Sequence, residues 1–230
     1  MKLLPFSYGI APDKTLSNVW EIDLEGTSCC GIIGPVGSGK SQLIKLLADP
    51  NRHPVAAWSE YPFCAYLSQD LTRLFTGNTA KSILDIYSDT RYTVGKHFSR
   101  DLFFRYAACL NVAGLIDDDR RLSHYSEGER QRLGICLAAA VRAPVTILDE
   151  PTTALDIECR KLLYDIIDEI RRRSYVFVIS HRLLDCLSVC DHMIRVSGLK
   201  VEEHFPIEQI LEKPHILSYY SVLQKEDSDV

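Results

Sequence analysis

Apolar residues along the chain fall into short runs and into helical repeats, a mixture that predicts an α/β protein. Residues 145–148 and 176–179 are continuous apolar runs, which is typical of central parallel strands covered on both faces. The stretch 157–173 between them predicts the helix that connects two such strands. Nearer the start, apolar runs bounded by turn-forming residues predict further strands at 3–8, 19–24 and 28–33.

The pattern changes in the middle of the chain, where helical spacing dominates from residue 71 to about residue 140. A shorter helix is predicted over 38–48, directly after a glycine-rich turn, and short strands are predicted at 65–67 and 192–201. We therefore expect a single domain over residues 1–230. Its parts are a catalytic core from 1–70 and about 141–215, an inserted helical subdomain over about 71–140, and a tail over 216–230.

The composition is that of a globular protein and excludes disordered and fibrous classes, since 46% of the 230 residues are hydrophobic and 25% are charged. The net charge of -5 gives no basic footprint, so we do not expect nucleic acid as a partner. The first residues lack the apolar core of a signal peptide. No apolar run approaches the roughly 20 residues needed to span a bilayer, so work at a membrane requires a partner chain.

The eight cysteines show neither paired CxxC spacing nor the framework of a small secreted protein, so we expect reduced, mostly buried thiols. Cys186, Cys190 and His192 are three candidate zinc ligands, but a structural zinc site needs four. Packing explains these residues better, and we assign no metal to them.

A glycine-rich segment matches the phosphate-binding pattern G-x-x-x-x-G-K-S, in which backbone N–H groups wrap phosphates at the start of a helix. Lys40 is expected to hold the terminal phosphates, and the Ser41 hydroxyl to bind Mg²⁺. A plain glycine turn before an ordinary helix is the weaker interpretation. The candidate cofactor-binding residues are Gly34, Pro35, Val36, Gly37, Ser38, Gly39, Lys40 and Ser41.

Two adjacent carboxylates, Asp149 and Glu150, follow the apolar run 145–148, at the strand end where α/β sheets place their ligands. Neighbouring side chains on a strand point in different directions, so Asp149 can serve the metal while Glu150 polarises a water. A solvated acidic loop is the alternative, and the phosphate loop upstream makes catalysis the stronger interpretation.

Residues 125–132 (Tyr-Ser-Glu-Gly-Glu-Arg-Gln-Arg) begin a predicted helix, because Ser126 and Glu129 have the spacing of a capping box. This segment resembles the signature motif of ATP-binding cassette (ABC) ATPases. Other motifs of that family occur in order around it: Gln69 before the helical region, Ala154, Leu155 and Asp156 after the acidic pair, and His181 after the next strand. The resemblance covers about residues 8–198.

The resemblance implies an α/β P-loop NTPase of the ABC cassette type. Its RecA-like core has a mainly parallel sheet, with an N-terminal antiparallel β region and an inserted helical subdomain. It implies ATP and Mg²⁺ as cofactors, and a head-to-tail dimer in which the Walker A loop of one subunit faces the signature of the other. Ser126 and Gly128 then act on the partner's ATP. Glu127 and Glu129 depart from the usual glycine and glutamine of the motif, and Glu127 adds negative charge there.

Further site residues follow from the same resemblance. The implied catalytic residues are Glu150, His181 and Gln69, and the implied metal ligands are Ser41, Gln69 and Asp149. Tyr8 takes the place of the aromatic residue that stacks on adenine, with Phe6 and Trp20 as nearby competitors and a core role as the alternative. A core histidine at the strand end is the alternative for His181.

Together these features predict an ATPase subunit that powers solute transport through separate transmembrane subunits, from the cytoplasmic side of the membrane. We favour import, with a metal, vitamin or peptide cargo suggested by residues 75–79 and 150–156. The second cassette is either another copy or a different chain. The alternatives are an exporter subunit and a soluble ABC ATPase that acts on nucleic acid or ribosomes, although Gln69 and Ser126 lie too close together for a long coiled-coil insertion.

Overall fold

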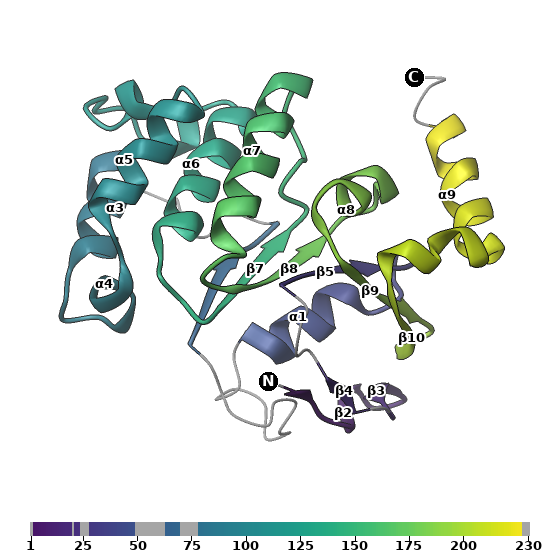
Figure 1. Ribbon diagram of the computed structural model, residues 1–230. Coiled ribbons are helices and arrows are strands. Elements are labelled where there is room, and N and C mark those ends of the chain that lie inside the picture. Colours follow the sequence, from purple (N-terminus) through teal and green to yellow (C-terminus); the bar gives the residue numbers. More distant parts are fainter. Residues whose placement is uncertain (1, 20, 24–27, 49–62, 70–77, 227–230) are drawn as a thin grey trace. The chain divides into compact units, whose positions relative to one another are not determined.

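The computed structural model describes residues 2–19, 21–23, 28–48, 63–69 and 78–226, and the chain divides into two compact units. Unit 1 combines Met1–Tyr61 with Phe177–Val230, and unit 2 is Pro62–Val176. Trp20 and residues 75–77 of the stretch compared with uptake cassettes lie outside the described residues. Figure 1 shows the ribbon and the labels of the elements, and each unit is considered by itself.

Unit 1 is built on strands whose central members are parallel. In β5 and β9, Ile32 lies opposite Ile194 in parallel register, and every residue of β5 is buried. The strands follow the order β2-β3-β10-β9-β5-β8. Their bounds are β2 (Phe6–Ala11), β3 (Lys14–Asn18), β5 (Cys29–Ile33), β8 (Tyr175–Ile179, which ends in unit 1), β9 (His192–Ser197) and β10 (Lys200–Pro206), with a separate antiparallel pair of β1 (Lys2–Leu3) and β4 (Ile22–Asp23).

The antiparallel region at the N-terminus is confirmed, and β4 lies within the predicted strand 19–24, but a further strand, β3, lies before it where none was predicted. Pro12 and Asp13 form a tight turn, so β3 folds back onto β2 at once and Tyr8 lies opposite Leu16. Leu16 is the only apolar residue of β3, which leaves almost no alternation for a sequence pattern to detect. The strand is fixed by pairing with its neighbours, β2 on one side and β10 on the other.

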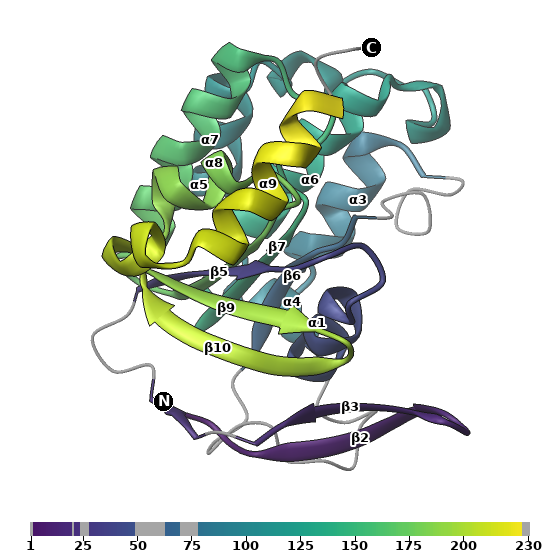
Figure 2. The ribbon, with the colours of Figure 1, turned by 90° about the vertical axis from the view of Figure 1, so that its right-hand side faces the viewer.

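Helices cover both sides of the unit 1 strands. Helix α1 (Lys40–Ala48) buries Leu43, Ile44, Leu46 and Leu47, each of which contributes roughly 1.5–3 kcal/mol through removal from water. Helices α8 (Leu183–Val189) and α9 (Pro214–Glu226) lie on the opposite side of β5 from α1 (Figures 1 and 2). The short 3-10 segment η3 (Ile207–Glu212) leads from β10 into α9.

Unit 2 carries a parallel strand pair and most of the helices. In β6 (Cys64–Leu67) and β7 (Val145–Asp149), Leu67 lies opposite Leu148, and all of β7 is buried. The polar side chain of Thr146 within this strand is satisfied by a 2.8 Å hydrogen bond between its Oγ1 and the Oγ of Ser174. The helices are α3 (Ala80–Ser88), α4 (Thr93–His97), α5 (Arg100–Cys109), α6 (Glu127–Ala140) and α7 (Ile157–Ile170), with 3-10 turns η1 (Ala113–Leu115) and η2 (Leu122–His124).

The thiols and the helix lengths agree with the sequence pattern. All eight cysteines are free, and Cys29, Cys30, Cys136, Cys186 and Cys190 are buried, which confirms mostly buried thiols. Over the part of the chain that the structure describes, we find no helix with both the length and the apolarity needed to cross a bilayer.

Candidate functional site

The glycine-rich segment forms a tight loop between β5 and α1, and two of its glycines have positive φ values and closely placed neighbours. Gly34 has φ 147°, and a Cβ there would lie 2.0 Å from the carbonyl oxygen of Val196. Gly39 has φ 107°, and a Cβ there would lie 2.9 Å from Cδ2 of Leu199. Only glycine adopts these dihedrals in such close quarters without strain, so the loop conformation follows from its composition.

The charged side chain of the loop is held by the loop itself. Nζ of Lys40 donates hydrogen bonds to the carbonyl oxygens of Gly34 at 2.7 Å and Pro35 at 2.9 Å. Lys40 is also the first residue of α1, so its ammonium group and the open N–H groups of the first helical turn belong to one short segment. Both carry positive charge or partial charge, which favours an anionic ligand.

Ser38 adds a polar atom that the protein leaves unsatisfied. Its side chain is 5% exposed, and its Oγ has no hydrogen-bond partner within the described ranges. Buried hydroxyls of folded proteins are nearly always hydrogen-bonded, so an unsatisfied hydroxyl at this position is typical of a ligand-binding site. The donor set of the loop therefore fits a phosphate group.

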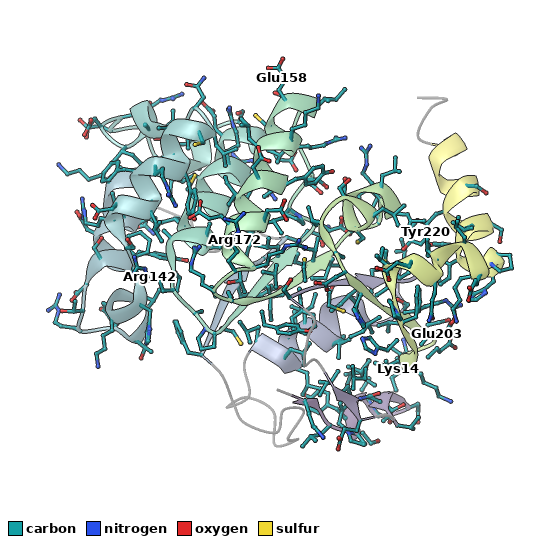
Figure 3. All side chains as sticks on the ribbon, viewed as in Figure 1. Lys14, Arg142, Glu158, Arg172, Glu203 and Tyr220 are labelled. Carbon is teal, nitrogen blue, oxygen red and sulfur yellow. The ribbon has the colours of Figure 1, made fainter. Side chains whose placement is uncertain are left out.

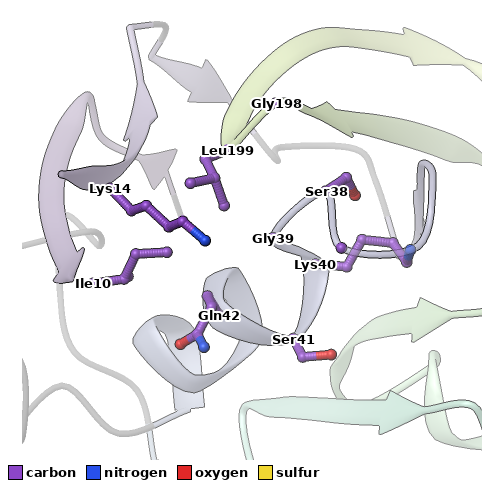
Figure 4. Close-up of a pocket in the computed structure, with 10 residues that line it drawn as sticks. Ile10, Lys14, Ser38, Gly39, Lys40, Ser41, Gln42, Gly198 and Leu199 are labelled. Atoms are coloured by element: carbon purple, nitrogen blue, oxygen red, sulfur yellow. The ribbon is translucent and has the colours of Figure 1, made fainter.

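A cavity of about 540 Å³ opens beside the loop (Figure 4). In Figure 4 the side chains of Ile10, Lys14 and Leu199 point toward one another across it. These three residues were not among the sequence candidates. All of the lining residues belong to unit 1: Ile10, Lys14, Gly37, Ser38, Gly39, Lys40, Ser41, Gln42, Gly198 and Leu199.

The turn between β9 and β10 brings Leu199 to the cavity. The Leu199 N–H donates to the Ser38 carbonyl at 3.0 Å, and the Leu199 carbonyl accepts from the Ser17 N–H at 2.9 Å. This turn therefore ties the phosphate loop to strand β3. Gly198 and Leu199 both have positive φ in this turn, and nothing in the sequence indicates that the turn reaches the loop.

Tyr8 lies on β2, half-buried, and is not among the residues that line the cavity. Ile10, two positions further along the same strand, does line it. Since alternate residues of a strand share a face, Tyr8 and Ile10 lie on the same side of β2. The stacking role of Tyr8 stays a prediction.

The two acidic residues lie at the end of β7 in unit 2. Asp149 is the last residue of the strand, and Glu150 follows it with φ 51°, a left-handed conformation that is uncommon outside glycine. Glu150 is 8% exposed, which does not fit the alternative of a solvated acidic loop. Residues held in such strained conformations cluster at functional sites.

Two polar side chains, one on β6 and one just after it, lie at the sheet edge where β7 ends. The Tyr66 hydroxyl donates to Oδ2 of Asp149 at 3.2 Å. Burial, together with the charge of Asp149, raises the pKa of Tyr66 to about 12, so the phenol stays protonated and remains a donor at neutral pH. Gln69 follows β6 and is exposed, and the parallel register of β6 and β7 places it at the edge where Asp149 lies.

The predicted capping box at the start of α6 is confirmed. The Ser126 Oγ accepts from the Glu129 N–H at 3.2 Å, and the Glu129 carboxylate accepts from the Ser126 N–H at 2.7 Å. The hydrogen bond from the Ser126 N–H and then the Ser126 side chain stabilise the carboxylate, which lowers the pKa of Glu129 below its usual value. Glu129 thus has a structural role where it departs from the family motif, and Ser126 lies exposed at the helix start.

Helix α6 lies against the segment that follows β7. A Cβ on Gly128 would lie 2.9 Å from the Ala154 carbonyl oxygen, so glycine permits this approach. The buried Gln131 donates from Nε2 to the carbonyl oxygens of Glu150 at 3.2 Å and Pro151 at 3.1 Å. The sequence analysis did not single out Gln131, because only the folded unit places these carbonyls beside it.

His181 follows β8 in unit 1 and is exposed, which does not fit a core histidine. The segment around it is fixed by Ser180, whose hydroxyl donates to Oδ2 of Asp185 at 2.8 Å and accepts from the Arg182 N–H at 3.0 Å. The sequence candidates are therefore distributed over both units. Unit 1 holds Tyr8, the loop 34–41 and His181, and unit 2 holds Gln69, Ser126, Gly128, Asp149 and Glu150.

A family model and several known proteins match this sequence. The family described as "ABC transporter" matches residues 18–153. The putative ABC transporter ATP-binding protein AlbC of Bacillus subtilis (strain 168) is 27% identical over 212 residues, which cover 85% of this chain and 87% of AlbC. The phosphate import ATP-binding protein PstB of Saccharolobus solfataricus is 28% identical over 225 residues, 88% of this chain and 86% of PstB.

Longer proteins match as well. The ATP-dependent lipid A-core flippase of Burkholderia thailandensis is 29% identical over 237 residues, but the matched part spans only 39% of the flippase. Among solved structures, an "ATP binding subunit of ABC transporter" superposes with a TM-score of 0.76 at 17% identity, covering 96% of this chain and 97% of that one. At this identity the structural likeness shows the fold.

Proposed function

The chain belongs to the ABC transporter family, with that family's P-loop cassette fold and ATPase activity, and we propose that it powers solute transport through separate transmembrane subunits. The observation that carries the proposal is the cavity beside the phosphate loop, with Lys40 at its edge and the orphan hydroxyl of Ser38 in its wall. AlbC and PstB, whose names describe ATP-binding proteins, are matched over most of their length. This coverage supports separate membrane subunits as partners.

We favour import, because PstB is an import protein matched over 86% of its length, whereas the flippase is matched over 39%. The proposed place of action is the cytoplasmic face of the membrane, where ATP is available. The cargo suggested by residues 75–79 and 150–156, a metal, vitamin or peptide, stays a prediction.

The phosphate loop and the start of α1 bind the phosphates of ATP in this proposal. The Lys40 ammonium, held by the Gly34 and Pro35 carbonyls, binds the terminal phosphates. Those carbonyls keep the ammonium within the loop, so little of its motion must be frozen when ATP binds. Tyr8 stacks on the adenine ring, and Ile10 and Leu199 supply apolar contact.

The donor set also fits Mg²⁺. Among the described residues no group of three or more His, Cys, Asp or Glu side chains is arranged to hold a metal. Mg²⁺ in nucleotide sites takes one or two carboxylates and completes its shell with phosphates and waters, so such a cage is not required. Ser41, Gln69 and Asp149 would hold the ion, which supplies charge neutralisation at the phosphate oxygens.

Glu150 is the proposed general base, with Gln69 and His181 as further catalytic groups. The Gln131 bonds to the Glu150 and Pro151 carbonyls fix the backbone that carries the base. The carboxylate of Glu150 is therefore oriented before the reaction begins. His181 is exposed, as a group that hydrogen-bonds the γ-phosphate must be.

Ser126 and Gly128 act on the ATP of a second cassette, either another copy of this chain or a different one. Ser126 is exposed, and its capping box presents the positive end of the 14-residue helix α6 to solvent. A phosphate of the partner's ATP is an anion of the kind that such a helix start binds.

Glu150→Gln tests the hydrolytic part, with ATP turnover and nucleotide binding measured on the same preparations. We expect turnover to fall by about 10²-fold or more, with ATP binding kept and a closed dimer stabilised. Unchanged turnover would remove Glu150 from the role of base. The transport part is tested by affinity purification from membranes: recovery of a polytopic partner supports it, and isolation of the chain with ribosomes or alone contradicts it.

A further inference from the structure

A buried side chain of the C-terminal helix α9 contacts the phosphate loop. Tyr220 is 3% exposed, and its hydroxyl accepts a hydrogen bond of 3.2 Å from the N–H of Gly34, a residue 186 positions away. Figure 3 labels Tyr220 on this helix. Both residues belong to unit 1, and neither the phosphate-binding pattern nor the family resemblance assigns Tyr220 a role.

Gly34 is the residue through which this contact reaches Lys40. Its N–H donates to Tyr220, while its carbonyl oxygen accepts from Nζ of Lys40 at 2.7 Å. On its remaining side the carbonyl of Val196 leaves no room, since a Cβ would lie 2.0 Å from that oxygen. Gly34 is thus constrained by contacts with Tyr220, Lys40 and Val196, and a substitution at Tyr220 removes the first of these contacts.

Helix α9 is well placed to act as a fixed support. Just before the helix begins, Nζ of Lys213 bonds Oε2 of Glu203 at 2.7 Å, and in its first turn Nε2 of His215 bonds Oε1 of the same carboxylate at 2.8 Å. Ile216, one turn before Tyr220, is buried as well. The helix is therefore joined to β10 at its start and reaches the loop with Tyr220.

A cavity of about 150 Å³ lies between the helix and the first residues of the loop. Gly34 and Pro35 line it from the loop, and Ile216 and Tyr220 line it from α9. The first residues of the loop and the buried face of α9 therefore border one cavity, and the hydroxyl of Tyr220 bonds the loop beside it.

We propose that Tyr220 is a positioning residue of the phosphate loop, through which α9 sets the affinity of the loop for nucleotide phosphates. The hydroxyl fixes the Gly34 peptide, the Gly34 carbonyl fixes the Lys40 ammonium, and the ammonium meets the phosphates. The inference rests on the proposed role of Lys40 in ATP binding.

Tyr220→Phe tests the proposal because it removes the hydroxyl and keeps the ring. We expect the dissociation constant for a fluorescent ATP analogue and the KM for ATP each to rise about tenfold, while kcat stays near wild type. The thermal midpoint should fall by a few degrees, because the buried Gly34 N–H loses its acceptor. Tyr219→Phe is the matched control. This variant removes the hydroxyl of the preceding ring of the same helix. Within the described part of the chain that hydroxyl makes no hydrogen bond to the loop, so KM should stay unchanged.

Two further measurements distinguish the possible failures. If wild-type protein binds the analogue and Tyr220→Phe binds it equally well, the role of Tyr220 is overturned and ATP binding stands. If wild-type protein does not bind it, the role of Lys40 fails. In a double-mutant cycle, Tyr220→Phe should have no further effect once Lys40→Ala is present, and additive losses contradict the path through Lys40.

Hydrogen exchange of the Gly34 amide gives a readout that needs no stable variant. The amide of wild-type protein should be protected, and Tyr220→Phe should exchange it at least tenfold faster while amides of β9 are unaffected. An unprotected Gly34 amide in the wild-type protein would overturn the proposal even if the variant fails to fold.

Discussion

The hydroxyl of Tyr66 donates to Oδ2 of Asp149 across a distance of 3.2 Å, so strand β6 orients the carboxylate that ends strand β7. Because the pKa of Tyr66 is raised to about 12 by burial and by Asp149, this donor is present throughout the neutral range. A hydrogen bond to a charged group contributes about 1.5–3 kcal/mol, enough to favour one orientation of Asp149 strongly.

Tyr66→Phe should therefore raise the Mg²⁺ concentration needed for half-maximal ATP turnover by about tenfold, because Asp149 samples orientations unsuited to the ion. The measurement is turnover as a function of Mg²⁺ at saturating ATP. Tyr106→Phe is the control, since it removes a buried hydroxyl of the same unit that accepts from Arg105 and Arg173 instead. An equal shift in both variants would contradict a specific effect on Asp149.

Gln131→Met should lower both stability and turnover. The substitution keeps the length of the side chain but leaves the carbonyls of Glu150 and Pro151 without their donor, which costs about 1–3 kcal/mol of unfolding free energy. We expect turnover to fall about tenfold with ATP affinity kept, because the phosphate loop is untouched. Gln209→Met, the same change at an exposed position, should alter neither, and urea unfolding with steady-state kinetics checks both variants.

Gly34→Ala and Gly37→Ala should differ sharply although both glycines have positive φ. At Gly37 no atom lies within 4 Å of a new Cβ, so we expect the unfolding free energy to fall only by the left-handed backbone strain, about 1–2 kcal/mol. At Gly34 the Cβ meets the Val196 carbonyl at 2.0 Å, so we expect a loss of at least about 3 kcal/mol and no ATP binding. Equal unfolding free energies for the two variants would contradict the close approach of the loop to β9.

Ser126→Arg should reduce turnover to about a hundredth of wild type while a single subunit still binds ATP, because the bulky cation blocks the partner's phosphate from the start of α6. Turnover is measured across a range of protein concentrations, together with ATP binding under dilute conditions. Ser188→Arg, at an exposed serine of α8, serves as the control. Full turnover in Ser126→Arg would rule out a signature that acts in trans.

Features set by a few neighbouring residues were predictable. The glycine-loop-helix segment 34–48, the Ser126 and Glu129 capping box and the buried strand β7 depend on local rules, namely positive φ at glycine, side-chain capping and continuous apolar runs. The strand at Lys14–Asn18 was not predicted, because its residues are mostly polar and only pairing with β2 and β10 selects them.

The sequence by itself determined the family, the glycine-rich loop and the residue types available for chemistry, because each depends on a short motif. Tertiary structure alone decided that Tyr66 bonds Asp149, that Gln131 holds the Glu150 backbone, and that Leu199 and Tyr220 reach the phosphate loop. Those contacts join residues up to 186 positions apart. No local pattern encodes them, since they arise only when the packing of whole strands and helices brings separate segments together.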